Sequence, residues 1–141
     1  MKKLFAILLA LVLALSLAAC GARQTEVTGA VSPVKVSDGD TLGQGKTTFR
    51  VTITNIDGES ITITVHTDEE TVGEALQKLG VIEGEEGDYG IYIKSVNQET
   101  HDYDKDGTYW SFYVDGEYAA AGADMTAIDP AVTYAFVAEK G

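Results

Sequence analysis

The chain has 141 residues, with 10 basic and 22 acidic side chains and a formal net charge of −12. An acidic protein of this kind repels the phosphates of nucleic acids and of anionic lipids, so we expect neither as a partner. The length fits one folded domain rather than two. Cys20 is the single cysteine, so the chain forms no internal disulfide and must be stabilised by a hydrophobic core.

The first 19 residues have the pattern of an export signal. Lys2 and Lys3 form a short basic segment, and an apolar run follows over residues 4–17. That run is shorter than the ~20 residues that a membrane-spanning helix needs, and a basic start before an apolar centre is typical of a secretory signal. We therefore predict a signal peptide over residues 1–19, and the residues at its end indicate the lipoprotein type.

The end of this signal, Leu17-Ala18-Ala19-Cys20, resembles the bacterial lipobox, where small residues before the cysteine allow cleavage. The alternative is an ordinary signal that leaves the thiol unmodified, although Cys20 has no partner cysteine. The lipobox implies that acyl chains such as palmitate are attached at Cys20, and two or more chains anchor a protein stably. We expect a membrane-anchored protein that faces the outside of the cytoplasm.

Removal of residues 1–19 leaves 8 basic residues against 22 acidic ones, a net charge of −14. Residues 20–45 are then poor in apolar side chains and rich in Gly, Ser, Thr and Asp, which predicts a flexible tether with a reach of roughly 25–30 Å. A short edge strand over Val31–Val36 is the alternative, although Pro33 disfavours it. The folded domain is expected over residues 46–141.

Regular structure is predicted to begin near Thr47 with two strands. Apolar residues alternate with threonines through Phe49–Ile56 and again through Ile61–Val65, as in strands that bury one face. Asp57-Gly58 lies between them and is a preferred pair for a hairpin turn, because both positions tolerate positive φ.

A helix of about two turns is predicted next. Thr71-Val72-Gly73-Glu74 fits a capping box at its start, and Gly80 can end it in the left-handed conformation. A helix this short is unstable alone, so we expect it to pack on the sheet with Leu76 and Leu79 buried. Its apolar stripe has the spacing i, i+3, i+4, i+7: Val72, Ala75, Leu76 and Leu79.

More strands are expected after an acidic loop over Glu83–Asp88. The turn pair Asp115-Gly116 ends the most aromatic of them, and Tyr118–Ala120 returns from it. A hairpin, one crossing helix and further strands predict an α+β fold of β-grasp-like type with a mostly antiparallel sheet. The predicted strands are Tyr89–Val96, Tyr109–Val114 and Val132–Val137.

Three segments carry a family resemblance: Thr71–Leu76, Ile93–Asn97 and, most specifically, Tyr109–Ala119. They resemble the transcobalamin-like C-terminal domain, whose bacterial members include lipoproteins of unknown function. The resemblance implies a β-grasp-like, surface-anchored binding module, and in animal vitamin B12 carriers this domain closes over cobalamin beside a helical domain. Two details differ from the family: Asp115-Gly116 replaces Asn-Gly, and Asp129-Pro130-Ala131 stands where Gly-Asp is usual.

The aromatic strand supplies the candidate ligand-binding residues. Alternation places Trp110 and Phe112 on one face and Tyr109 and Tyr113 on the other. One face must line the core, and the other could stack on a ring or a corrin, unless both faces are structural. We expect Trp110 and Phe112 in the core, since tyrosine hydroxyls tolerate water. The predicted ligand-binding residues are Tyr109, Tyr113, Tyr118 and Trp110.

An acidic segment, Asp102–Gly107, fits the opening of a calcium loop. Position twelve of that loop would be Tyr113 instead of the usual glutamate, so we prefer an acidic turn and keep a weak calcium site at Asp102, Asp104 and Asp106 as the alternative. His66 and His101 have no zinc spacing.

No catalytic motif such as H-E-x-x-H or G-x-S-x-G is present, so we predict a protein that is not an enzyme and has no cofactor. The leading hypothesis is a surface lipoprotein whose domain captures a small molecule for uptake, with cobalamin or another corrinoid as a possible ligand. The alternative is a module that binds an envelope protein or cell-wall polymer and no small ligand.

Overall fold

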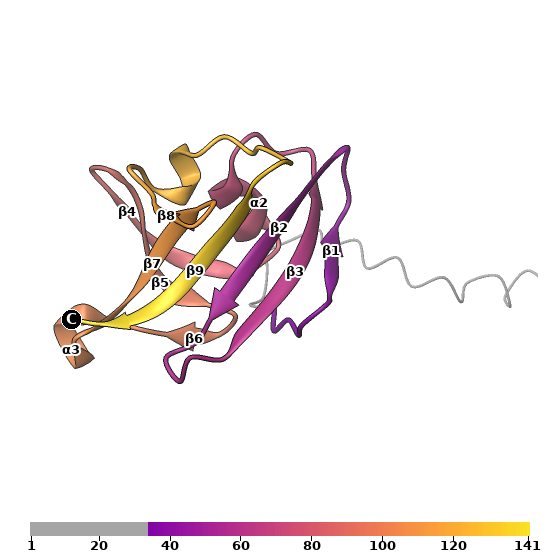
Figure 1. Ribbon diagram of the computed structural model, residues 1–141. Coiled ribbons are helices and arrows are strands. Elements are labelled where there is room, and N and C mark those ends of the chain that lie inside the picture. The colour runs from indigo at the N-terminus through magenta and orange to yellow at the C-terminus, as the bar shows by residue number, and fades with distance from the viewer. Residues whose placement is uncertain (1–33) are drawn as a thin grey trace, which may run out of the picture.

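Two strands from opposite ends of the domain pair at the centre of its larger sheet. In the computed structural model, which describes residues 34–141, β2 (Thr47–Thr54) runs parallel to β9 (Thr133–Lys140). Antiparallel strands flank this pair: β3 (Ser60–Thr67) lies beside β2, and β7 (Thr108–Val114) lies beside β9. Two short edge strands complete the sheet on its outer sides, β1 (Thr41–Gly43) next to β3 and β8 (Glu117–Tyr118) next to β7 (Figure 1).

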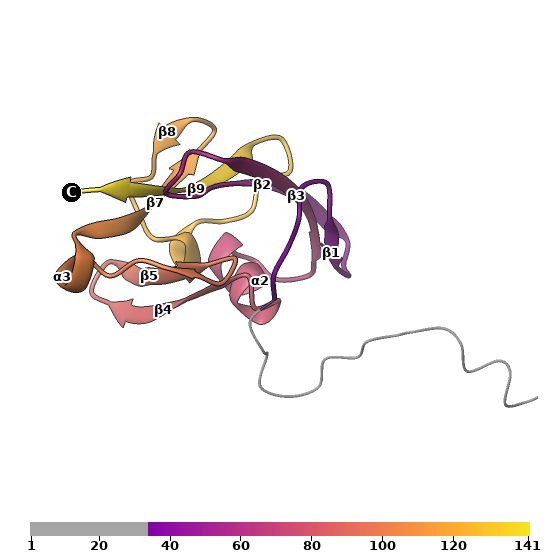
Figure 2. The same cartoon turned by 90° about the horizontal axis from the view of Figure 1, so that it is seen from below.

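A second, smaller sheet and a helix cover one face of the larger sheet. The elements involved are α2 (Val72–Lys78), β4 (Ile82–Gly87), β5 (Gly90–Val96), β6 (Glu99–Thr100), the one-turn helix α3 (Tyr103–Asp106) and the 3-10 turn η2 (Ala123–Met125). The smaller sheet has the order β4-β5-β6, and Figure 2 shows it beside α2 beneath the larger sheet. One helix crossing a mostly antiparallel sheet confirms the predicted β-grasp-like α+β fold.

The hydrophobic core lies between these two layers. β2 contributes Phe49, Val51 and Ile53 at alternate positions, as predicted for a strand with one buried face. Leu76 of α2 belongs to the same cluster and is 0% exposed, as predicted, whereas Leu79 is only partly buried. Leu79 is the C-cap residue, so the helix has already ended where the predicted apolar stripe continues.

Local sequence signals set both ends of α2. The Thr71 hydroxyl accepts the N–H of Glu74 at 3.2 Å, which is one half of the predicted capping box. Gly80 follows the helix with a φ of 75°, the left-handed conformation predicted for it. Gly73 faces η2, where a Cβ would clash with the backbone of Asp124. Glycine at this position therefore allows α2 and η2 to approach closely.

The two Asp-Gly pairs adopt different turns. Asp115-Gly116 has φ values of 50° and 84° and closes the tight β7–β8 hairpin, as predicted. Asp57-Gly58 lies in the connection of the β2–β3 hairpin, as predicted, but within a wider loop between Thr54 and Ser60 in which Gly58 has positive φ and Asp57 does not. Asn55 Oδ1 accepts the backbone N–H of Asp57 at 3.0 Å, which stabilises the longer loop.

The acidic segment Glu83–Asp88, predicted as a loop, forms most of strand β4, and this is a correction to the prediction. Every residue of β4 except Ile82 at its start is exposed, so the strand shows no alternation of apolar and polar side chains. β4 is an edge strand that pairs with β5 through main-chain hydrogen bonds. Such bonds can form with any type of side chain. The register shifts between Glu83 and Gly84, as at a β-bulge.

The described part of the predicted tether, residues 34–45, packs on the domain. Val36 is 3% exposed, and its N–H donates to Asn97 Oδ1 at 2.7 Å. The strand in this region is β1 rather than any part of residues 34–36, and it pairs in parallel with β3. A Cβ on Gly43 would clash with the backbone of β3, and a Cβ on Gly45 would clash with the backbone at the end of β3. These two glycines therefore allow the segment to pack closely against β3. The folded unit therefore begins before the predicted start near Thr47.

The predicted signal peptide, Cys20 and the first part of the predicted tether lie outside the described residues. Within residues 34–141, no helix is both long and apolar enough to cross a membrane.

Candidate functional site

An open groove with a volume of about 560 Å³ lies between β5, β7, α3 and the segment that follows β8. Its floor includes Trp110 and Phe112, each 8% exposed, as well as Ile91 and Ile93. Its tyrosines include four that are well exposed: Tyr89, Tyr92, Tyr103 and Tyr118. The groove thus offers carbon surface at its base and aromatic rings with hydroxyl groups around it.

Charge is sparse in the lining of the groove. Asp104, the second residue of α3, is the single charged side chain among the lining residues that the structure describes. Ala119–Ala123 form one wall and add small apolar side chains and backbone. Asp124, just after this wall, accepts the N–H of Ile91 at 2.8 Å and so ties the wall to β5.

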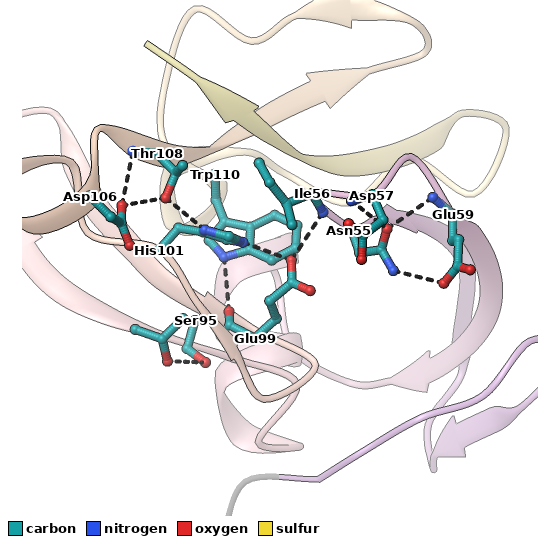
Figure 3. A network of polar contacts seen from close by, with 11 residues as sticks. Asn55, Ile56, Asp57, Glu59, Ser95, Glu99, His101, Asp106, Thr108 and Trp110 are labelled. Carbon is teal, nitrogen blue, oxygen red and sulfur yellow. Dashed lines mark hydrogen bonds and ion pairs between the residues drawn. The ribbon is translucent and has the colours of Figure 1, made fainter.

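Trp110 is held in place by polar contacts at its edge. Its indole Nε1–H donates to the backbone oxygen of Glu99 at 3.0 Å, and its ring meets the ring of His101 edge to face, with centroids 5.2 Å apart (Figure 3). A buried indole normally needs such a partner for its N–H. These contacts fix the orientation of the indole in the floor of the groove.

His101 links Trp110 to two neighbouring segments. It is 7% exposed, with Nδ1 lying 2.7 Å from Thr108 Oγ1 and Nε2 lying 2.7 Å from Glu99 Oε2. The same Glu99 oxygen accepts the N–H of Ile56 at 3.3 Å, and the Thr108 hydroxyl donates to Asp106 (Figure 3). The two ring nitrogens of His101 thus join the Thr108 hydroxyl to the Glu99 carboxylate.

Tyr109 and Tyr113 lie on the face of β7 opposite Trp110, beside Glu139 of β9. The Tyr113 hydroxyl donates to Glu139 Oε1 at 3.1 Å, and Ser111 donates to the other carboxylate oxygen. The negative charge of Glu139 raises the pKa of Tyr109, and burial, followed by the contact with Glu139, raises the pKa of Tyr113. Both phenols therefore stay protonated and able to donate.

The four predicted ligand residues fall in two groups. Trp110, Tyr109 and Tyr118 line the groove, whereas Tyr113 does not and instead packs its ring edge-on against Tyr118 at 5.7 Å. Trp110 and Phe112 are buried, as predicted for the core face.

Three tyrosines of the groove were not predicted as site residues: Tyr89, Tyr92 and Tyr103. They come from the β4–β5 turn, β5 and α3, and they meet β7 only through tertiary packing. Their exposure next to other aromatic side chains is visible in the structure, but no local sequence pattern marks it.

The acidic segment forms α3 and its caps, and its three carboxylates act separately. Asp102 caps the helix by accepting the N–H of Asp104 at 3.1 Å and lies 3.7 Å from Lys94 Nζ. The Asp106 carboxylate accepts the backbone N–H of Thr108, and Asp104 borders the groove. Residues 34–141 contain no group of three His, Cys, Asp or Glu side chains that could hold a metal ion.

Comparison with known proteins covers the same region. Residues 69–133 match the family described as "Domain of unknown function (DUF4430)". This match includes all three segments of the family resemblance and every lining residue of the groove. No match is found among curated proteins.

Two solved structures are similar to this chain. A presumed metal binding protein from Ruminococcus gnavus ATCC 29149 is 27% identical, with a TM-score of 0.63, over 68% of this chain and 99% of that chain. Haptocorrin in complex with Cbi is 20% identical, with a TM-score of 0.47, over 67% of this chain and 25% of that chain. The Ruminococcus protein therefore shares the architecture of this domain along nearly its whole length.

Proposed function

We propose that the chain is a lipid-anchored protein on the outside of the cytoplasm whose domain binds a small organic ligand in the aromatic groove. The observation that carries this proposal is the groove itself. Its volume of about 560 Å³ lies within the range of small-molecule sites, and its lining is mainly aromatic and apolar with a few polar groups. The proposal includes no catalysed reaction.

The lining favours a ligand with a flat, largely apolar face. Exposed tyrosine rings stack on such faces, and their hydroxyls bond to polar groups at the edge of a ring system. Asp104 in the lining and the net charge of −14 disfavour anionic ligands. A corrinoid is the ligand that the sequence resemblance implies, and capture for uptake is the matching role.

The test uses Trp110, the single tryptophan of the chain, as a fluorescent reporter in the floor of the groove. Mature protein in detergent is titrated with a panel of corrinoids and other flat ring compounds. Metal ions are titrated in parallel, because the Ruminococcus protein is described as metal-binding. We expect a saturable change in fluorescence with at least one ring compound.

Variants then locate the binding site. Tyr89 and Tyr118 are 89% and 71% exposed in the groove, so Tyr89→Ala with Tyr118→Ala should leave folding intact and weaken binding about tenfold, from two lost stacking contacts. Met125 is 63% exposed and does not line the groove, so Met125→Ala is the matched control and should bind normally. Equal affinities in all three proteins would place binding elsewhere.

A further inference from the structure

Strand β7 has one fully paired edge and one edge that is mostly unpaired. On one side, β9 pairs with every residue of β7 from Thr108 to Val114. On the other side, β8 reaches only Tyr113 and Val114, and the N–H of Ala119 adds one bond to the oxygen of Phe112 at 3.0 Å. Among the described residues, no other strand pairs with this second edge.

The alternation of an antiparallel ladder shows which main-chain groups point outward. The N–H of Asp115 donates to Thr133 at 2.9 Å, so odd-numbered residues of β7 bond to β9. The main-chain N–H and C=O groups of the even-numbered residues therefore point away from β9. The N–H of Thr108 agrees with this, because it donates to Asp106 Oδ1 at 2.9 Å instead of to β9. The N–H of Phe112 and both main-chain groups of Trp110 face the free edge, and no other described backbone bonds to them.

This free edge lies inside the groove. Side chains of consecutive strand residues point to opposite faces of a sheet. Tyr109 and Trp110 are consecutive, yet both line the groove. A groove that touches both must pass around the free edge of β7 or around its end next to α3, because the other edge of β7 is covered by β9. The ligand site therefore offers main-chain hydrogen-bonding groups in addition to aromatic rings.

We propose that an extended peptide segment adds to the free edge of β7, with its main chain bonded to Trp110 and Phe112 and alternate apolar side chains in the groove. Addition of a strand to an exposed sheet edge is a common mode of peptide recognition. This inference rests on the proposed binding role of the groove and adds a second class of ligand, an extended peptide.

Charge complementarity selects a basic peptide. Glu139 lies on the outer face of β7 and β9 beside Tyr109 and Tyr113, and Asp104 lies in the groove. The chain from Cys20 onward carries a net charge of −14. A peptide that alternates apolar and lysine residues would place its apolar side chains against Trp110 and its ammonium groups near Glu139.

The probe is a seven-residue peptide of alternating Lys and Val, acetylated and amidated at its ends, titrated into mature protein in detergent. Trp110 fluorescence is expected to saturate with this peptide, and a matched Glu/Val peptide should bind at least about tenfold more weakly because of charge repulsion. Asp104→Asn should narrow the difference between the two peptides. A Glu/Val peptide that binds as well as the Lys/Val peptide would overturn the choice of a basic ligand.

Two methylated peptides test the main-chain pairing. One carries N-methyl groups on three Val amides and the other on three Lys amides, so their compositions match. In a strand, only alternate amides face the neighbouring strand. One methylated peptide should therefore lose about tenfold or more in affinity, since its N-methyl groups remove the bond to the Trp110 oxygen and hold its main chain away from the edge, while the other stays close to the parent. Equal affinities for both would overturn pairing at the edge.

The outcomes separate this inference from the proposed function. If ring compounds bind and the Lys/Val peptide does not, the peptide inference fails and the binding role of the groove stands. If Tyr89→Ala with Tyr118→Ala changes neither titration, the groove itself fails as the site. Analytical ultracentrifugation gives a further outcome. If the protein is a dimer that neither the Lys/Val nor the Glu/Val peptide dissociates, a second copy of the chain occupies the edge, and the inference is overturned.

Discussion

At the scale of single residues, Asp106 shows how one side chain fixes the start of β7. Its carboxylate accepts the backbone N–H of Thr108 at 2.9 Å and also the Thr108 hydroxyl. These bonds favour the ionised form, and the hydroxyl is the larger cause, so the pKa of Asp106 lies below its ordinary value of 3.8. Because the folded-state pKa is depressed, the stabilisation is present above pH 3.8 and is lost as the pH falls through the lower value.

The first prediction concerns this carboxyl group. Thr108→Val keeps the β-branched shape but removes the hydroxyl, so the pKa of Asp106 should rise toward 3.8 while the backbone bond persists. NMR titration of the Asp106 carboxyl carbon in both proteins measures this shift. A titration midpoint that is the same in both would show that the hydroxyl does not set the pKa.

Trp110 illustrates why the sequence left its role open. Alternation correctly predicts that Trp110 and Phe112 share a face and that this face is buried. It cannot show that the same indole borders a groove, because the opposite wall comes from Tyr92 on β5 and from Ala119–Ala123. Tyr113 fails to reach the groove for a related reason, since Glu139 on a neighbouring strand holds its hydroxyl.

At the scale of elements, periodicity predicts those parts whose side chains carry the packing. β2, β3 and α2 each bury one face, so their apolar spacing marks them in the sequence. β4 and β1 are held mainly by main-chain pairing to a neighbour, and such pairing leaves little trace in side-chain type. For this reason the sequence predicted a loop where β4 forms and a flexible tether where β1 forms, and both predictions were wrong.

The helix α2 provides a prediction at this scale. Leu76 is 0% exposed within the core, so Leu76→Ala should lower the free energy of unfolding by roughly 2–5 kcal/mol through lost burial and a cavity. Urea unfolding followed by circular dichroism measures the change. Leu79→Ala is the control, because the partly buried C-cap side chain loses less contact. A larger loss at Leu79 than at Leu76 would contradict the observed register of the helix.

At the scale of the whole molecule, the described chain starts beside the end of α2, and its first strand lies across the domain from the groove. The N–H of Val34 bonds to Gly80 at 3.0 Å, beyond the end of α2, and the chain then enters β1. In both Figure 1 and Figure 2, β1 lies on the opposite side of the domain from α3 and β8, which border the groove. An anchor attached before Val34 would therefore join the domain beside the end of α2, an element that does not line the groove.

The last prediction tests that anchor. If acyl chains are attached at Cys20, wild-type protein expressed in a bacterium should partition into the detergent phase, since two or more chains bind membranes stably. Cys20→Ser removes the thiol that carries the lipid, so this variant should remain uncleaved or be released in soluble form. Phase partitioning with mass spectrometry of the N-terminal peptide measures both results. Recovery of both proteins in the aqueous phase, with an unmodified Cys20 thiol in the wild type, would exclude lipid anchoring.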